Sequence, residues 1–385
     1  MLFNLHLRHM RFYALLARLP HFALSYASGF RVVPKPVMMV WEATYRCAAR
    51  CLSCNRWRIG GSDTELTTSE AKRLIDDAFA LGVRLLVVSG GDPLMRGDVI
   101  DLGGHARARG MLTVLCTTGA QIHEKNVHAI MESFDVFELP LDSLVPELHD
   151  RLRGRKGMFD RTMTALELLL AHRQPRHGIE LTTVVRNENY REVGDINRRF
   201  APLGIVTALQ PLHQGLYGAT IEDSFNWAAG YEDAWNQVID NYLWYDGYSR
   251  QALETFFRQI PIFVQTPEKL RDAYTCFAGS YSFFVDPNGY IYICDVLRQH
   301  VGNIRDRPLQ DIWVGLTDLR RAVSSYQRRC NCWLLCTTPP SLFITRCMRC
   351  YPIRAHTPQA TDALRTLWAG LDEGDSSAPY VSRSL

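Results

Sequence analysis

The sequence predicts a parallel α/β fold followed by a small cysteine-rich module. From about residue 38, six short β-rich runs alternate with longer helical patterns, which is typical of a parallel sheet, open or barrel-like. The chain has 385 residues, 47% of them hydrophobic and 22% charged, as in an ordinary globular protein of two or three domains. Eleven cysteines, clustered at both ends of the chain, indicate metal sites rather than disulfides in so large a protein.

Residues 1–36 form an amphipathic, basic extension before the first predicted strand. Arg8, Arg11 and Pro20 interrupt any apolar run that a signal peptide would need. Two interpretations stay open: this segment packs on the main domain, or it lies on the inner face of a membrane. No run of about 18 apolar residues occurs, so no transmembrane helix is expected. Cysteines that serve as metal ligands in a chain without a secretion signal indicate the reducing cytosol, so we expect a cytoplasmic protein with a peripheral membrane contact left open. A net charge of +3 gives no indication of a nucleic-acid partner.

The main domain is expected over residues 37–215. Its predicted strands are Val37–Glu42, Arg84–Ser89, Met111–Thr117, Val136–Leu141, Ile179–Arg186 and Ile205–Gln210. The helices predicted between them include Glu70–Leu81, Phe159–His172 and Tyr190–Phe200. The first of these has the pattern of a capping box, with Thr67 as the N-cap and Glu70 three residues later.

Three further segments complete the predicted organisation. Residues 216–273 are a helical connector rich in tryptophan and tyrosine, whose rings either form a core between two domains or line a substrate pocket. Residues 274–352 hold seven cysteines and are expected to form a small domain organised by metal. Residues 353–385 are expected to form a C-terminal helix and a polar tail.

The first cysteine cluster follows the first predicted strand directly. Cys47, Cys51 and Cys54 have the spacing C-x3-C-x2-C. Three thiolates this close can hold three corners of a [4Fe–4S] cluster, and the fourth iron is then left open for an exogenous ligand. A structural zinc ion would need a fourth protein ligand, and the spacing of the nearby histidines supplies none. The pattern therefore favours an iron–sulfur cluster over zinc.

Polar or glycine-containing motifs follow the other predicted strands at the same edge of the sheet. Parallel α/β folds assemble their active sites at this edge, so we expect these motifs to surround one ligand. They are Ser89-Gly90-Gly91-Asp92-Pro93, Thr117-Thr118-Gly119, Leu141-Asp142-Ser143, the run His149–Gly154 and Gln210-Pro211.

The cysteine motif and the Gly90-Gly91-Asp92-Pro93 motif together resemble the radical SAM superfamily. This resemblance implies a partial (β/α)6 TIM-like barrel whose open iron binds S-adenosylmethionine (SAM). One electron from the cluster then cleaves SAM, and the resulting 5′-deoxyadenosyl radical takes a hydrogen atom from the substrate. The sequence departs from the family pattern at Ser53, where an aromatic residue is common, and at Asp92, which replaces a glutamate.

The resemblance also implies roles for the residues at the strand ends. Gly90, Gly91, Asp92 and Pro93 would hold the methionine part of SAM. Thr118 stands where the family often has asparagine, and Asp142 stands at the place of a ribose contact. Arg153 would meet the SAM carboxylate, and Gln210, at the end of the sixth strand, is a further SAM-binding candidate. A reducing partner such as flavodoxin or ferredoxin is implied as well.

The second cysteine cluster resembles SPASM and "twitch" domains, which hold auxiliary [4Fe–4S] clusters. The segment Tyr281–Cys294 is predicted to form a hairpin around Asp286-Pro-Asn-Gly289, and the link that follows it resembles the one in those domains. One auxiliary cluster is assigned to Cys276, Cys294, Cys332 and Cys336. Cys347 and Cys350, with or without Cys330, would hold a second cluster or a zinc ion. Whether there are one or two auxiliary clusters stays open, and Cys116 is expected to be a core cysteine.

These observations predict a radical SAM enzyme whose catalytic side chains are not identified. With only about 37 residues before the first strand, no separate peptide-recognition module is evident. We therefore expect a small-molecule, saccharide or lipid-linked substrate. One alternative is a maturase that modifies a ribosomally made peptide, as many SPASM relatives do. Another is a non-catalytic iron–sulfur or zinc protein that acts as a sensor or scaffold.

Overall fold

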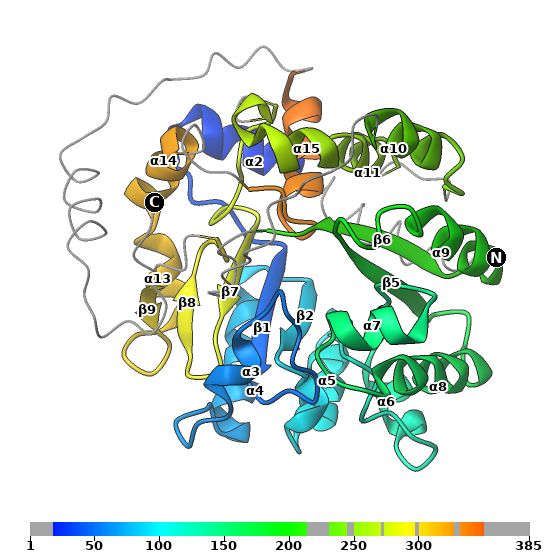
Figure 1. Ribbon diagram of the computed structural model, residues 1–385. Coiled ribbons are helices and arrows are strands. Elements are labelled where there is room, and N and C mark those ends of the chain that lie inside the picture. Colours follow the sequence, from blue (N-terminus) through cyan, green and yellow to red (C-terminus); the bar gives the residue numbers. More distant parts are fainter. Residues whose placement is uncertain are drawn as a thin grey trace.

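A computed structural model describes residues 18–213, 231–244, 250–270, 273–296, 300–326 and 332–349. These residues form one mixed nine-stranded sheet with the strand order β6-β5-β4-β3-β2-β1-β7-β8-β9. Strands β1 to β6 are parallel and lie side by side in chain order. The edge strands β6 and β9 do not pair, so the sheet curves into an open partial barrel (Figure 1). The predicted α/β fold is confirmed.

All six predicted strands of the core are present, and their ends lie within two residues of the predicted ones. A parallel pair needs a crossover connection, and the helical runs between the strands supply it. The strands are β1 Met38–Thr44, β2 Leu85–Gly90, β3 Leu112–Cys116, β4 Val136–Pro140, β5 Gly178–Val185 and β6 Val206–Pro211.

Helices cover the outer face of the parallel strands (Figure 1). Helix α4 begins as predicted: the Thr67 hydroxyl accepts a hydrogen bond from the Glu70 N–H, and the Glu70 carboxylate accepts one from the Thr67 N–H. The helices of the core are α3 Arg56–Ile59, α4 Thr68–Leu81, α5 Val99–Ala108, α6 Val127–Ser133, α7 Pro146–Leu152, α8 Met158–Ala171 and α9 Val193–Phe200.

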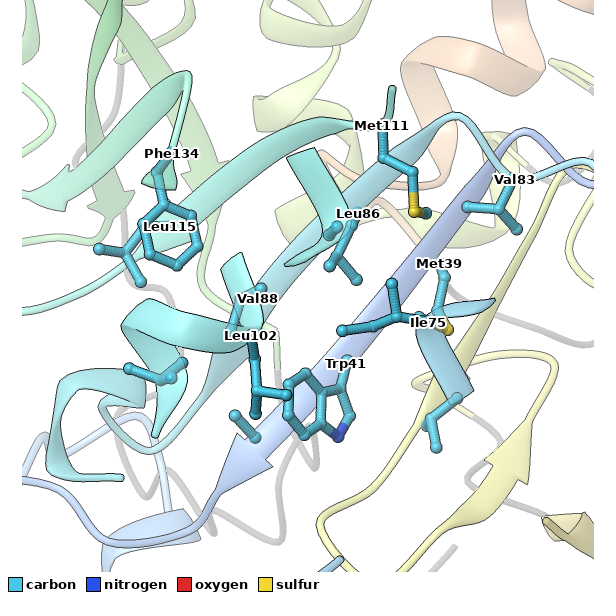
Figure 2. Close-up of a cluster of buried hydrophobic side chains, with 14 of the residues drawn as sticks. Met39, Trp41, Ile75, Val83, Leu86, Val88, Leu102, Met111, Leu115 and Phe134 are labelled. Carbon is cyan, nitrogen blue, oxygen red and sulfur yellow. The ribbon is translucent and has the colours of Figure 1, made fainter. Parts of the chain in front are cut away.

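The main hydrophobic core lies between the sheet and these helices. Figure 2 shows Trp41 of β1 and Val88 of β2 beside Leu102 of α5, and Met39 of β1 beside Ile75 of α4. All five side chains are buried. The positions that face the helices are apolar along each strand, which is why the strands are predicted from largely hydrophobic runs in the sequence.

The inner face of the barrel changes character along the strands. At the amino ends it is apolar, with Leu85, Val114 and Val136 packed together. Toward the carboxyl ends the inward positions become polar, as at Glu138 of β4 and Thr182 of β5, which line a cavity. This change confines polar chemistry to one end of the barrel.

The described part of the connector forms a second core, and one of its rings, Phe257, also lines the cavity. The described parts of residues 216–273 are α10 Tyr231–Asp240, α11 Arg250–Arg258, α12 Ile260–Gln265 and the 3-10 turn Pro267–Leu270. Trp235 and Tyr242 are buried among other aromatic side chains, so the core interpretation is confirmed for them. Trp227 and Tyr245 lie outside the described residues.

The cysteine-rich segment extends the main sheet. Its first strand, β7 (Ser282–Val285), pairs in parallel with β1, and β8 (Tyr290–Tyr292) returns antiparallel to β7. The predicted hairpin is therefore present, and its turn places Gly289 at φ +85°. Strand β9 (His300–Asn303) completes the sheet, and helices α13 Leu309–Val314, α14 Thr317–Tyr326 and α15 Thr338–Arg349 follow.

The described part of the N-terminal extension packs on the protein body. Helix α2 (Leu19–Ala27) buries Phe22 in a cluster that also contains Ile344 of α15. This supports the packing interpretation for these residues, whereas residues 1–17 lie outside the described part and their membrane contact stays a prediction. Among the described residues, no helix has both the length and the apolar character to cross a bilayer.

Candidate active site

The three-cysteine loop begins where β1 ends and is held against the end of α7. The Arg50 N–H donates to the Arg153 carbonyl oxygen over 2.9 Å, and the Leu52 N–H donates to the Leu152 carbonyl oxygen over 3.2 Å. The close approach requires Gly154, because a Cβ there would collide with the backbone of Arg50. Residues about 100 positions apart in the chain thus fix the shape of the loop.

The cysteine side chains of this loop lie in a protected environment. Cys47, Cys51 and Cys54 are all partly buried, and Cys51 and Cys54 line the inner cavity. Burial raises the pKa of both Cys47 and Cys54 to about 12, with the neighbouring Cys51 contributing in each case. Burial therefore favours the neutral thiols of the free chain, and thiolate ligation requires a cationic group such as the irons of a cluster.

Arg153 is a cation that contacts one of these thiols. One of its terminal nitrogens lies 3.7 Å from the Cys51 Sγ, and the other lies 2.8 Å from the Asp142 carboxylate. Although burial opposes its charge, Asp142 and Cys51 together raise the pKa of Arg153 above its usual value. Arg153 lines the cavity, whereas Asp142 is buried behind it and also accepts a hydrogen bond from the Val184 N–H.

The Gly90-Gly91 motif packs against the start of the cysteine loop. The Gly91 N–H donates to the Thr44 carbonyl oxygen over 2.7 Å. A Cβ at Gly91 would lie 2.6 Å from the Tyr45 carbonyl oxygen, and one at Gly90 would collide with Thr44. Both glycines line the cavity, but close contact with the protein's own backbone already explains why they are glycines.

Asp92 joins the ends of β2 and β3. Its carboxylate accepts hydrogen bonds from the Thr117 hydroxyl over 2.8 Å and from the Leu94 N–H over 3.2 Å, and both the N–H and the hydroxyl of Thr118 donate to it. The side chain is fully buried, and burial raises its pKa. Thr118 lines the cavity in front of it. Pro93, also buried, opens a short 3-10 turn.

Gln210, the last of the predicted SAM-binding residues, binds a loop of the C-terminal module. Its amide oxygen accepts a hydrogen bond from the Leu335 N–H over 2.7 Å, and its amide nitrogen donates to the Trp333 carbonyl oxygen over 3.1 Å. Cys332 and Cys336 flank this loop. Gln210 lines the cavity, but its amide is engaged with the protein rather than held open for a ligand.

Three of the predicted auxiliary ligands lie close together. Burial raises the pKa of Cys276 and Cys336 to about 12, and electrostatic interaction with the nearby Cys332 adds to the increase in both. Cys294 is buried after β8, and its Sγ accepts a hydrogen bond from the Val296 N–H over 3.3 Å. Of the remaining three, Cys347 falls in α15, while Cys330 and Cys350 lie outside the described residues.

A buried cation links the two cysteine regions, which the sequence did not predict. Arg56, two residues after Cys54, contacts the Glu42 carboxylate of β1, and the same nitrogen lies 3.3 Å from the Asp295 carboxylate. Asp295 follows Cys294 directly. The three charged residues line the cavity, and each side chain is less than one-tenth exposed. Their partners are distant in the sequence, so no local pattern could have indicated the contact.

The cavity runs along the inside of the barrel, from Met38, Leu85 and Leu112 near the amino ends of β1 to β3 to the polar carboxyl ends between the two cysteine regions. Its volume is about 780 Å³, and side chains from every core strand and from α11 and α15 line it. Glu138 and Glu180, paired in register on β4 and β5, form part of the wall. Cys116, expected in the core, packs against the apolar cluster of the inner face but is only partly buried. It also lines the cavity and donates to Glu138 over 3.3 Å.

Comparison with known proteins defines the class to which this site belongs. Residues 41–200 match the radical SAM superfamily, and residues 276–337 match SPASM, an iron–sulfur cluster-binding domain. The chain is therefore an enzyme that joins a SAM-cleaving barrel to a domain for auxiliary clusters. It belongs to the radical SAM superfamily, within the group that carries a SPASM domain.

Several named proteins are similar to this chain. The AdoMet-dependent heme synthase of Methanosarcina barkeri is 27% identical over 72% of this chain and 82% of its own. The PqqA peptide cyclase of Ruegeria pomeroyi is 35% identical over 41% and 42%, and the mycofactocin maturase MftC of Mycobacterium tuberculosis is 25% identical over 74% and 71%.

Solved structures support the fold. Streptococcus suis SuiB superposes with a TM-score of 0.56 at 15% identity and covers 77% of this chain and 72% of its own. The enzyme anSMEcpe, solved with AdoMet and a peptide, superposes with a TM-score of 0.54 at 16% identity, covering 77% and 84%. At this level of identity the similarity establishes the architecture and not the substrate.

The enzyme uses SAM, a [4Fe–4S] cluster at the radical site and auxiliary iron–sulfur clusters. The residues present fit such groups, because three partly buried thiols stand beside a buried arginine at the wall of the cavity. Among the described residues, no three His, Cys, Asp or Glu side chains are arranged around a single metal ion. Cys47, Cys51 and Cys54 would hold the first cluster, which with SAM supplies a radical able to remove a hydrogen atom.

Proposed function

We propose that this enzyme modifies a side chain or the backbone of a ribosomally made peptide by SAM-dependent radical chemistry. Two named relatives support this, the PqqA peptide cyclase and the mycofactocin maturase, and the second matches about three quarters of the chain. The SPASM domain lies beside the barrel in one continuous sheet, so the substrate cavity adjoins both cysteine regions. Net oxidation, epimerisation and bond formation are all compatible with this arrangement.

The size of the cavity supports a substrate that enters only in part. Binding sites for drug-sized molecules have volumes of roughly 300–1,000 Å³, and this cavity of about 780 Å³ has to hold SAM and the reacting group together. A peptide inserts one side chain and leaves the remainder at the mouth. The cavity volume is compatible with a peptide, and the match of the mycofactocin maturase to 74% of the chain carries the preference for one.

A second candidate is modification of a tetrapyrrole side chain. It is favoured by the match to AdoMet-dependent heme synthase, which extends over 295 residues and both domains. The three arginines that line the cavity in the described part of the chain already have partners, however. Arg56 and Arg153 pair with carboxylates, and Arg84 donates to the carbonyl oxygens of Phe79 and Val83. A substrate with several carboxylates would have to compete for them.

One experiment separates these candidates. The reconstituted enzyme is incubated without oxygen with SAM, dithionite and either peptides encoded next to its gene or iron-coproporphyrin III. We expect 5′-deoxyadenosine with each mixture, and a change of mass in a peptide only. The matched control is Cys51→Ala, which should yield neither product. A change of mass in the porphyrin with every peptide left intact would overturn the proposal in favour of the tetrapyrrole.

A further inference from the structure

A cation is buried in the C-terminal module without a carboxylate beside it. Arg320 lies on α14 and is only 1% exposed. Among the described residues, no aspartate or glutamate pairs with Arg320, and its Nη1 atom has no hydrogen-bond partner. Burial lowers the pKa of Arg320 to about 9, so the guanidinium is still charged at neutral pH. A buried charge of this kind destabilises the fold unless it binds other groups or serves the function.

Two backbone carbonyl groups and one aromatic ring hold this cation. The Arg320 Nε donates to the Gly279 carbonyl oxygen over 2.6 Å, and its Nη2 donates to the Trp313 carbonyl oxygen over 2.7 Å. The guanidinium carbon lies 4.4 Å from the centre of the Trp313 ring, within the range of a cation–π interaction. None of these three partners carries a negative charge, so the positive charge of Arg320 is held in place without being neutralised.

The first of these carbonyl groups belongs to the turn that follows Cys276. Gly279 is three residues after Cys276, and its φ of +72° is one that glycine adopts readily. A Cβ at Gly279 would lie 3.1 Å from the side chain of Ile293, the residue before Cys294. Arg320 therefore binds the backbone at a point that adjoins two of the predicted auxiliary ligands.

The same turn supplies a hydrogen bond to a cysteine sulfur. Burial raises the pKa of the Cys276 thiol to about 12, and a hydrogen bond from the Ala278 N–H opposes this increase. The next N–H, that of Gly279, donates to the Ser282 carbonyl oxygen over 3.0 Å and closes the turn. Hydrogen bonds to the sulfurs and the charges around a cluster both set its reduction potential. An N–H donor and a nearby cation each favour the reduced form, because that form carries one more negative charge.

We propose that Arg320 is a positioning residue of the auxiliary site and that it raises the reduction potential of the cluster ligated by Cys276. Its bond to Gly279 fixes the turn that directs the Ala278 N–H to the Cys276 sulfur, and its charge favours the reduced cluster. Reduction transfers one electron from a reductant such as dithionite, which is oxidised, and exchanges no proton or bond. This role depends on Cys276 as a ligand and on no particular substrate, so it stands apart from the proposed modification of a peptide.

The test measures the potential of the auxiliary cluster alone. In the full-length variant Cys47→Ala/Cys51→Ala/Cys54→Ala, the electron paramagnetic resonance signal of the reduced protein comes from auxiliary clusters only, and a dithionite titration follows it against potential. The signal that is lost on adding Cys276→Ala identifies the cluster concerned, and if no signal were lost the proposal would be wrong. In the same background we expect Arg320→Met to make reduction at least about tenfold less favourable, which is a fall of about 59 mV.

A second variant separates the charge from the hydrogen bonds. Arg320→Gln keeps an N–H donor for the Gly279 carbonyl oxygen but carries no charge. We expect it to bind as much iron as the parent protein and to show most of the fall in potential, because the charge supplies the larger part of the effect. An unchanged potential in Arg320→Gln would overturn the proposal, whether or not Arg320→Met retains its cluster.

Arg321, the next residue on α14, supplies the matched control. Its guanidinium donates to the Gly29 carbonyl oxygen and to the Asp318 carboxylate, and its side chain is 38% exposed. Arg321→Met removes the same charge from the same helix, and we expect reduction to stay within about twofold of the parent protein, because solvent screens an exposed charge. An equal fall in potential in the two methionine variants would contradict the proposal. Because the titration needs neither SAM nor a peptide, failure here is distinguishable from failure of the proposed peptide modification.

Discussion

The two buried aspartates at the strand ends bind other groups of the protein. Asp92 holds two neighbouring strand ends together, and Asp142 holds Arg153 in place beside Cys51. Both had been assigned to SAM because they stand at family positions. In the structure Arg153 and Thr118 are the side chains that face the cavity, and the aspartates lie behind them. These positions belong to the site, and the assignment of Asp92 and Asp142 to SAM binding stays a prediction.

Gly91 offers a test of this packing at the scale of one residue. We expect Gly91→Ala to lower the free energy of unfolding by about 1–3 kcal/mol, because the added methyl group would meet the backbone of Tyr45 and Arg46. We also expect a loss of iron from the three-cysteine site, since this backbone leads into the cysteine loop. Urea unfolding and iron analysis of the purified protein measure the two effects.

Gly97 is a matched control for that substitution. It is a few residues further along, and a Cβ there meets no atom within 4 Å. Gly97→Ala should change the free energy of unfolding by less than about 0.5 kcal/mol and leave the iron content unchanged. If the two variants were equally stable and equally loaded with iron, the close approach of Gly91 to the cysteine loop would not be important.

Residue types can be predicted from the sequence when the chemistry is local. Cys47, Cys51 and Cys54 lie within eight residues, and their spacing alone indicates a three-point ligand. The roles of Cys116 and Glu138 could not be predicted in this way. The contact between these two side chains depends on how β3 pairs with β4. The sequence alone does not show this pairing.

At the scale of elements, the sequence predicts each strand and helix of the barrel better than it predicts how they combine. Each βα unit has its own hydrophobic period and caps, so it is readable alone. The pairing of β7 with β1 was not predicted, because strand partners that are distant in the chain leave no local pattern. The cysteine-rich module is consequently an extension of the barrel sheet and not a separate layer.

The loop between Cys332 and Cys336 depends on one side chain from β6. Gln210 satisfies both the Leu335 N–H and the Trp333 carbonyl oxygen. We expect Gln210→Leu to leave these two backbone groups without that partner and to cost about 2 kcal/mol. The auxiliary site should lose iron while the three-cysteine site stays loaded. Iron content and the electron paramagnetic resonance signals of the reduced clusters distinguish the two sites.

Two further variants show whether the effect comes from the clamp. Gln210→Glu keeps an acceptor for the Leu335 N–H but cannot donate to Trp333, so its auxiliary signal should lie between those of wild type and Gln210→Leu. Gln310→Leu removes an exposed glutamine from α13 and should have no effect. A full auxiliary signal in Gln210→Leu would show that the loop holds its shape without the amide.

At the scale of the whole molecule, two ion pairs among the described residues join the barrel to the C-terminal module. Arg56 contacts Glu42 and Asp295 in a buried position at the cavity. Arg305 joins the module to Glu70 of α4 at the surface, with an Nε to Oε1 distance of 2.7 Å. An arginine–carboxylate ion pair thus occurs once in a buried position and once at the surface. Burial determines how much stability the protein should lose when each pair is broken.

Removing the cation of the buried ion pair should lower the free energy of unfolding far more than removing the cation of the surface pair. Arg56→Met leaves two carboxylates at the cavity wall without this partner, and breaking such a network costs about 3–5 kcal/mol. We expect the module to detach early, so that urea unfolding shows two transitions instead of one. The triple variant Glu42→Gln/Arg56→Met/Asp295→Asn removes the charges together and should recover most of the loss.

The surface pair supplies the control and adds a dependence on pH. Arg305→Met should cost no more than about 1 kcal/mol, because solvent screens exposed pairs. The hydrogen bond from Arg305 lowers the pKa of Glu70 to about 2, so the stabilisation is complete above the usual glutamate pKa of 4.5 and is lost as the pH falls toward 2. The free energy of unfolding in urea should therefore differ slightly between Arg305→Met and wild type at pH 7, and the difference should be smaller at pH 3.

The comparison of the two variants tests the buried contact. If Arg56→Met lost no more free energy of unfolding at pH 7 than Arg305→Met, the buried contact would not strengthen the attachment of the module to the barrel.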